Sequence, residues 1–121
     1  MKHFLNIKDN SYISLRKILL DAKKRKFKRK NFETLEIDVD RPLKDNLLIQ
    51  MFEKSSLRTR LSFYLAIRQL GGSALTLRPD ELHLSKGGES IADTAKILSS
   101  FVDIFMLRTD DEKKLNSFHK Y

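Results

Sequence analysis

Apolar residues recur along this chain with two spacings, and the two alternate from one stretch to the next. Spacing of three and four positions predicts helices over about residues 12–29, 57–70 and 89–101. Short apolar runs, typical of buried strands, occupy about residues 46–52, 73–77 and 102–107. Asp110 and Asp111 can cap a last helix that runs from Glu112 to about His119.

The order of these elements predicts an α/β fold, a three-layer doubly wound parallel sheet with right-handed crossovers. Ligands of such sheets bind at the carboxyl ends of the strands. Ser56, the loop at 79–88 and Arg108 each follow a predicted strand, so we expect them at one edge of the sheet. Residues 35–39 alternate between apolar and acidic, which predicts either a short strand or an extended connection.

Length and composition fit one packed domain, since the chain has 121 residues of which 40% are apolar. No apolar run is long enough to span a membrane, and the first residues do not resemble a secretory signal. The chain has no cysteine, which excludes disulfides, thiol catalysis and cysteine metal sites. We therefore expect a cytoplasmic protein without contact to a membrane.

The net charge of +8 is concentrated in one stretch, the basic run at residues 23–30. Such a run can bind nucleic acid or an anionic membrane surface, and it can equally be the solvated end of a helix. One aromatic residue interrupts it and no nucleic-acid fold signature accompanies it. Nucleic-acid binding through residues 23–30 is therefore kept as an alternative rather than the first expectation.

Hydroxyl and guanidinium groups gather in the stretch Phe52–Arg60, where a predicted strand passes into a helix. The N-terminus of a helix has N–H groups without partners and a partial positive charge, so it suits an anion. Ser56 can cap the helix or donate to a ligand oxygen, and Arg58 can form paired hydrogen bonds to phosphate. A capped helix with two solvated arginines explains the same residues, and residue type alone does not decide between the two.

Arg58 and Arg60 are two positions apart, about 200° around a helix, so both cannot face one ligand. Arg58 lies nearer the free N–H groups and is the expected ligand, whereas Arg60 is expected to pair with an acid or pack between elements. His3, His83 and His119 do not have metal-ligand spacing, and no metal site is expected. The Lys86-Gly87-Gly88 segment is either a lid over an anion or an ordinary loop.

The stretch Phe52–Phe63 resembles the F-E-x-x-S-T-R-T-R-x-S-F motif of the aspartate and ornithine carbamoyltransferases. The similarity continues through Gln69–Gly72, Glu89–Ala95 and the strand-end segment Met106–Thr109. Lys54 and the Met-Leu-Arg-Thr ending favour the ornithine branch. The chain is identified as a member of this family by motifs that span nearly its whole length in the right order.

The resemblance implies transfer of a carbamoyl group from carbamoyl phosphate to an amine, the δ-amine of ornithine, in arginine biosynthesis and without a cofactor. It implies that Ser56, Leu57, Arg58 and Thr59 hold the phosphate, with Thr59 and Arg108 near the carbonyl oxygen. It places His83 and, less firmly, Lys86 at the same ligand. The catalytic residues would be Arg58, Thr59 and Arg108, acting by electrostatics. The family is at least trimeric, so a homotrimer is implied.

Three positions depart from the family pattern. Leu57 replaces the usual threonine and loses a hydroxyl, Tyr64 replaces a common glutamate, and the loop at 85–88 is one residue longer.

The sequence also stops before the H-P-x-Q segment. We therefore expect residues 1–121 to be a carbamoyl-phosphate-binding domain that is incomplete at its C-terminus, with the amino-acid-binding domain absent and no activity alone. The remaining alternatives are a fragment of the aspartate type and a non-catalytic anion-binding or regulatory module.

Overall fold

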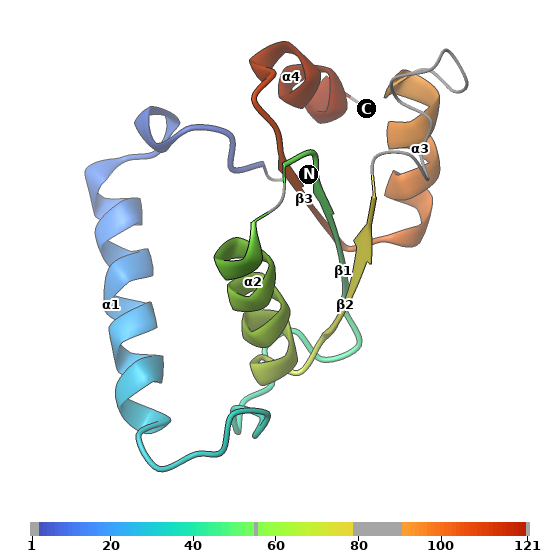
Figure 1. Cartoon of the computed structure of the whole chain (residues 1–121). Helices are drawn as coiled ribbons and strands as arrows, with labels where there is room; N and C mark the ends of the chain where they lie inside the picture. The colour runs from blue at the N-terminus through green and yellow to red at the C-terminus, as the bar shows by residue number, and fades with distance from the viewer. Residues whose placement is uncertain (1–2, 55, 79–90, 121) are drawn as a thin grey trace.

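A parallel sheet of three strands forms the centre of the molecule (Figure 1). The computed structural model describes residues 3–54, 56–78 and 91–120. The strands are β1 (Leu47–Phe52), β2 (Ser73–Leu77) and β3 (Ile104–Arg108), in the order β2-β1-β3. Both pairings are parallel, and they place Ile49 of β1 opposite Leu75 on one side and Phe105 on the other. The predicted α/β fold with a parallel sheet is confirmed.

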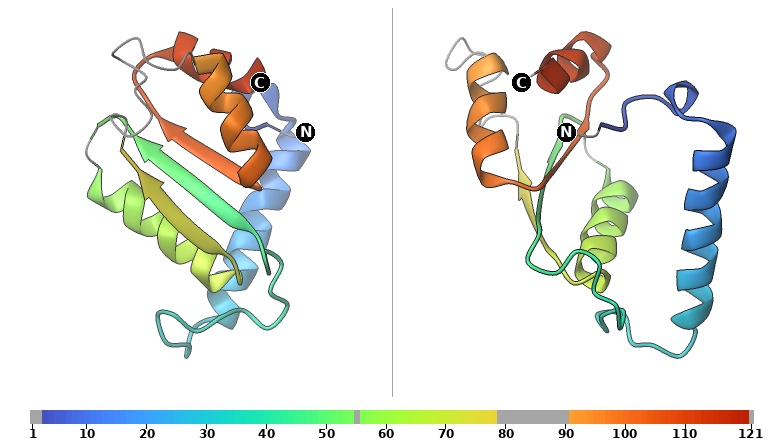
Figure 2. Two further views of the ribbon diagram at one scale, coloured as in Figure 1. Left: turned by 90° about the vertical axis from the view of Figure 1, so that its right-hand side faces the viewer. Right: turned by 180° about the vertical axis from the view of Figure 1, so that it is seen from behind.

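Strand β1 lies in the middle of the sheet and supplies three of the six buried apolar residues in the described part of the chain. Ile49 and Met51 pack with Ala95 and Leu98 of α3 (Ile91–Phe101) on one face. Because side chains alternate along a strand, Leu48 and Gln50 point to the other face, which α2 (Leu57–Gln69) covers (Figure 2). The two helices on opposite faces make the predicted three layers.

The turn Gly71-Gly72 ends α2 and directs the chain into β2. The N–H of Gly72 donates to the Ile67 carbonyl at 2.9 Å, and that of Gly71 donates to the Arg68 carbonyl at 3.1 Å. This is the Schellman arrangement, which requires a left-handed residue after the helix, and Gly71 has φ 99°. A Cβ at Gly72 would lie 2.9 Å from the Asn46 carbonyl oxygen, so a side chain does not fit there.

Ser11 is the N-cap of helix α1 (Tyr12–Lys28), and its hydroxyl accepts a hydrogen bond from the Ser14 N–H. The helix lies on the same side of the sheet as α2 and has no buried residue (Figures 1 and 2). Residues 35–39 form no strand and connect α1 to β1. The strand alternative is therefore wrong, and residues 35–39 belong to a connection with turns at 34–35 and 39–40, in whose middle Asp38 is buried.

Strand β3 begins at Ile104, two residues later than predicted, because Asp103 closes the turn before it. The Asp103 carboxylate accepts a hydrogen bond from the Leu47 N–H at 2.8 Å, and the Asp103 N–H donates to the Leu47 carbonyl. The chain continues into α4 (Glu112–Lys120), as predicted. A 3-10 turn at Ile7–Asp9 precedes α1, and the predicted start of α3 at residues 89–90 lies outside the described residues. No helix in the described part of the chain is long and apolar enough to cross a membrane.

Candidate functional site

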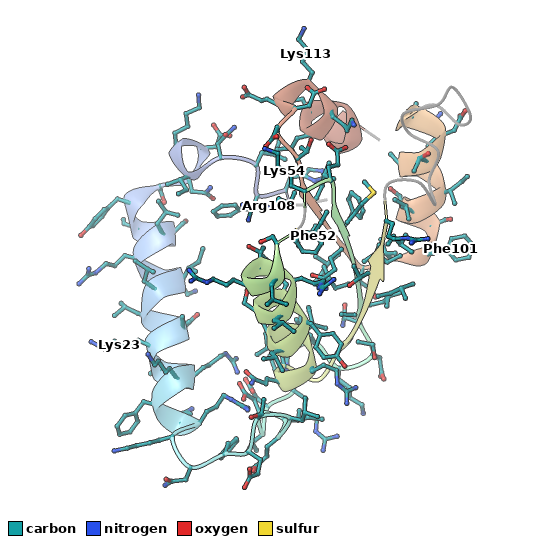
Figure 3. All side chains as sticks on the ribbon, in the orientation of Figure 1. Lys23, Phe52, Lys54, Phe101, Arg108 and Lys113 are labelled. Atoms are coloured by element: carbon teal, nitrogen blue, oxygen red, sulfur yellow. The ribbon has the colours of Figure 1, made fainter. Side chains whose placement is uncertain are left out.

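The carboxyl ends of β1 and β3 lie side by side. The connection that leaves β1 leads to β2 on one side of it, and the connection that reaches β3 leads to the other side. From β1 the chain passes through α2 to β2, and from β2 it passes through α3 to β3 on the far side of β1. This reversal makes a crevice between β1 and β3, the usual ligand position of a doubly wound sheet. Figure 3 shows Phe52, Lys54 and Arg108 gathered above the N-terminal end of α2.

The N-terminal end of α2 has hydrogen-bond donors that are not used within the helix. Ser56 is its N-cap residue, but the Ser56 side chain makes no capping hydrogen bond. The first N–H groups of a helix lack intrahelical acceptors, and the first turn of α2 contains no acidic side chain to neutralise its partial positive charge. The backbone at Leu57, Arg58 and Thr59 is therefore set to accept an external anion.

Arg108 at the end of β3 reaches the first turn of α2. Its Nη1 donates to the Thr59 hydroxyl at 2.8 Å, across the crevice between β3 and α2. Two residues expected at one site from separate stretches of the sequence are thus in contact. The Arg58 side chain is exposed, and no side chain in the described part of the chain pairs with its guanidinium.

Glu53 connects the loop after β1 with the turn after β3. Its backbone N–H donates to the Arg108 carbonyl at 3.0 Å. Its carboxylate accepts a hydrogen bond from the Thr109 hydroxyl at 2.6 Å and pairs with the Lys114 ammonium at 2.5 Å. Both side chains of this ion pair are about four-fifths buried, with exposed fractions of 20% and 21%.

A depression of about 130 Å³ lies at the ends of β1 and β2, next to Ser56. Three cationic side chains line it, those of Lys54, Arg60 and Arg78. Arg60 pairs with no acidic side chain among the described residues, and it lies beside residues of β1 and β2 in this depression. The depression therefore adjoins the start of α2 on the side of β2.

His83 and Lys86 lie outside the described residues, so their predicted places at the ligand stay predictions. Within residues 3–54, 56–78 and 91–120, no group of three or more His, Asp or Glu side chains is arranged to hold a metal ion. Of the predicted site residues that the structure describes, all lie together at the switch point of the sheet: Ser56, Leu57, Arg58, Thr59 and Arg108.

A second and larger cleft, of about 430 Å³, lies between α1 and the connection that follows it. Arg25 and Arg29 of the basic run both bind the buried carboxylate of Asp38, at 2.9 and 2.6 Å. Arg25 also binds Asp40 at 2.8 Å, and this hydrogen bond lowers the pKa of the Asp40 carboxyl from its ordinary value of 3.8. The Asp38 N–H donates to the Gln69 carbonyl at 2.7 Å, so the cluster attaches α1 to the end of α2.

Sequence reasoning did not assign a role to Glu53 or Lys114. Glu53 is part of the motif and directly follows β1, which was a usable signal. Lys114 follows Glu53 by 61 positions, and no local pattern indicates that the two side chains meet. The same is true of Arg25 and Arg29, whose partners are visible only once the connection is folded.

Comparison with known proteins gives the family. The model of the "Aspartate/ornithine carbamoyltransferase, carbamoyl-P binding domain" matches residues 2–121. The ornithine carbamoyltransferase of Caulobacter vibrioides is 41% identical over 117 residues, which are 97% of this chain and 37% of that protein.

Solved structures agree with the sequence match. The ornithine carbamoyltransferase of Pyrococcus furiosus superimposes with a TM-score of 0.87 at 38% identity, over 99% of this chain and 36% of that chain. The catalytic subunit of M. jannaschii aspartate transcarbamoylase superimposes with a TM-score of 0.81 at 30% identity, over 100% of this chain and 38% of that chain. The chain thus spans somewhat more than a third of the length of the relatives it matches, and the ornithine type is the better supported branch. The chain belongs to the aspartate/ornithine carbamoyltransferase family and corresponds to its carbamoyl-phosphate-binding domain.

Proposed function

We propose that this chain binds carbamoyl phosphate at the N-terminal end of α2, as the carbamoyl-phosphate-binding part of an ornithine carbamoyltransferase. The contact between Arg108 and Thr59 carries the proposal, because it joins two motif residues at the switch point of the sheet. The remaining donors are the start of α2, where the Ser56 side chain makes no cap, and the Arg58 guanidinium, which pairs with no side chain among the described residues. All of these groups donate hydrogen bonds, as a phosphate dianion requires.

The phosphate would lie against the α2 backbone at Leu57, Arg58 and Thr59, with the Ser56 hydroxyl and the Arg58 guanidinium as further donors. Thr59 and Arg108 would face the carbonyl oxygen. When the amine nitrogen attacks the carbonyl carbon, a C–N bond forms, the C–O bond to phosphate breaks, and the amine proton passes to the departing phosphate. Negative charge grows on the carbonyl oxygen and the leaving phosphate, where the fixed donors stabilise it.

We propose further that His83 and Lys86 complete this site, and that ornithine is the acceptor in a homotrimeric enzyme of the arginine pathway. The acceptor would be bound by a second domain outside the matched region, since the match covers only 37% of the relative from Caulobacter vibrioides. On this proposal the 121-residue chain binds carbamoyl phosphate but forms no citrulline by itself. The acceptor and the trimer rest on the family alone.

Isothermal titration calorimetry of the chain with carbamoyl phosphate tests the binding proposal. Saturable binding, together with no citrulline when ornithine is added, is the expected result. Inorganic phosphate serves as the comparison ligand and should bind more weakly, because it has no carbonyl group for Thr59 and Arg108. Absence of any heat of binding from a folded sample would refute the proposed site.

A non-catalytic anion-binding or regulatory module would give the same calorimetric result with this chain. The two proposals differ once the chain is fused to the amino-acid-binding domain of an ornithine-type relative. The enzyme proposal expects citrulline formation from the fused protein. A fused protein that is folded and binds carbamoyl phosphate, but forms no citrulline, would favour the module.

A further inference from the structure

Arg108 is the one proposed ligand on β3, and it must project at a fixed angle toward α2. A strand end is held on one side by its sheet hydrogen bonds, but nothing in the strand itself fixes the residues after it. The described structure shows a closed set of contacts at this point, centred on Glu53 and Thr109.

The contacts form a ring of four residues. The Thr109 hydroxyl donates to Glu53 Oε2 at 2.6 Å and accepts a hydrogen bond from the Asp111 N–H at 3.0 Å. The Asp111 carboxylate accepts from the Lys114 N–H at 3.3 Å, in the first turn of α4. The Lys114 ammonium donates to Glu53 Oε1 at 2.5 Å, which closes the ring.

This ring leaves the chain little freedom on either side of Arg108. The Glu53 N–H already fixes the Arg108 carbonyl at 3.0 Å, and the ring fixes the next side chain, Thr109. Removing Glu53 or Lys114 leaves the other charge partly buried without its partner, which is costly. The peptide between Arg108 and Thr109 is therefore held by α4 through Lys114.

We propose that Lys114, acting through Glu53 and Thr109, is a positioning residue for Arg108 in carbamoyl phosphate binding. The proposal rests on the proposed function, since it assigns a role to Arg108 at that ligand. Lys114 does not touch the proposed ligand site. It sets the direction from which Arg108 reaches Thr59, and a misplacement of about 1 Å is enough to weaken a site about tenfold or more.

The same two loops contain a matched control. Lys54, in the loop after β1, forms an ion pair at 2.7 Å with Asp110, in the turn after β3. Their side chains are 68% and 70% exposed. Exposed pairs of this kind contribute little, because water screens them. Asp110→Asn therefore removes a charge pair from the same turn without disturbing the ring.

The test compares Lys114→Met, Lys114→Arg and Asp110→Asn in the 121-residue chain. Lys114→Met keeps the length of the side chain and removes its charge, so we expect a loss of about tenfold in carbamoyl phosphate affinity. Lys114→Arg should restore most of the affinity, and Asp110→Asn should leave it unchanged. Calorimetry is carried out well below the melting temperature of each variant, so that only folded protein is compared.

A second readout separates positioning from general stability and does not need the ligand. The NMR resonances of the Arg108 side-chain Nε–H and the Thr59 N–H report the contact between these residues. Lys114→Met should shift both resonances, and Lys114→Arg and Asp110→Asn should not. A purely structural role would lower the melting temperature while leaving the two resonances and the affinity of the folded protein unchanged, which would overturn the proposal.

Failure of the proposed function and failure of the positioning role give different results. If the unmodified chain fails to bind carbamoyl phosphate, the proposed function fails, and the Arg108 and Thr59 resonances still decide whether Lys114 positions Arg108. If Lys114→Met does not fold, Thr109→Val opens the same ring at a neutral residue and carries the same expectation, with Thr109→Ser as the variant that keeps the hydroxyl. Unchanged resonances in Thr109→Val would overturn the proposal equally.

Discussion

Arg108 Nη1 donates a hydrogen bond to the Thr59 hydroxyl at 2.8 Å, although the two residues are 49 positions apart. Arg108 ends β3 and Thr59 lies in the first turn of α2, so the contact joins the two elements that meet at the switch point of the sheet. The proposed site is therefore assembled from parts that the fold already holds together.

Arg58 is expected to supply the strongest single contact to the phosphate. Charged hydrogen bonds of this kind contribute about 1.5–3 kcal/mol, so Arg58→Ala should weaken carbamoyl phosphate binding by about 10- to 100-fold. The side chain is exposed, and the melting temperature should barely change. Arg16→Ala on the exposed surface of α1 is the control for loss of one positive charge, and equal affinity losses in the two variants would exclude a direct contact by Arg58.

Leu57 is the residue at which the site departs from the usual family pattern. Its side chain is 62% exposed at the start of α2, so a threonine fits without a change in the core. Leu57→Thr should add one hydroxyl donor and strengthen carbamoyl phosphate binding several-fold. The control is Leu57→Val, because valine has nearly the shape of threonine but no hydroxyl. A gain of affinity in Leu57→Val as well would show that the hydroxyl is not responsible.

Asp38 is expected to be the residue that holds α1 to the rest of the molecule. It is 7% exposed and binds both Arg25 and Arg29, so Asp38→Ala should lower the free energy of unfolding by about 2–3 kcal/mol, measured by urea denaturation. Asp40 binds Arg25 at the exposed end of the same cluster, and Asp40→Ala should cost much less. A larger loss for Asp40→Ala would contradict the central role of Asp38.

The Asp40 contact should also depend on pH. Arg25 lowers the pKa of the Asp40 carboxyl in the folded chain. The stability that the Arg25–Asp40 contact contributes is therefore complete above the ordinary pKa of 3.8, and it is lost as the pH falls through the lowered pKa. The difference in unfolding free energy between the unmodified chain and Asp40→Asn should be constant between about pH 7 and pH 5 and shrink toward about pH 3. A difference that grows on acidification would contradict the sign of this linkage.

The basic run gives a test of the nucleic-acid alternative. Replacing its lysines by glutamine, while Arg25 and Arg29 stay in place, should leave the fold and carbamoyl phosphate binding unchanged, because these two arginines make the structural contacts. The unmodified chain should show no specific affinity for duplex DNA at physiological salt. Tight binding that falls steeply with salt and disappears in the glutamine variant would instead support nucleic-acid binding through residues 23–30.

The order of helices and strands was predictable from the sequence, because each depends on near neighbours. Ile49 and Met51 alternate with Leu48 and Gln50 in a short apolar run, and Gly71-Gly72 is a local stop signal for α2. The boundaries were less predictable, as at β3, where the Asp103 side chain binds Leu47 across 56 positions and delays the strand. Residues 35–39 had a strand pattern, but Asp38 is held by arginines and forms no ladder.

The sequence by itself determined which residues are suited to an anion, since Ser56, Arg58 and Thr59 form one continuous motif at a helix start. Only the tertiary structure decided how Arg108 reaches them, because that depends on β3 lying beside β1 rather than beside β2. It also decided that Lys114 and Glu53 pair across 61 positions and that Arg25 and Arg29 hold the connection after α1. Local patterns reflect neighbours along the chain, whereas these contacts join residues that only the folded arrangement of helices, strands and connections brings together.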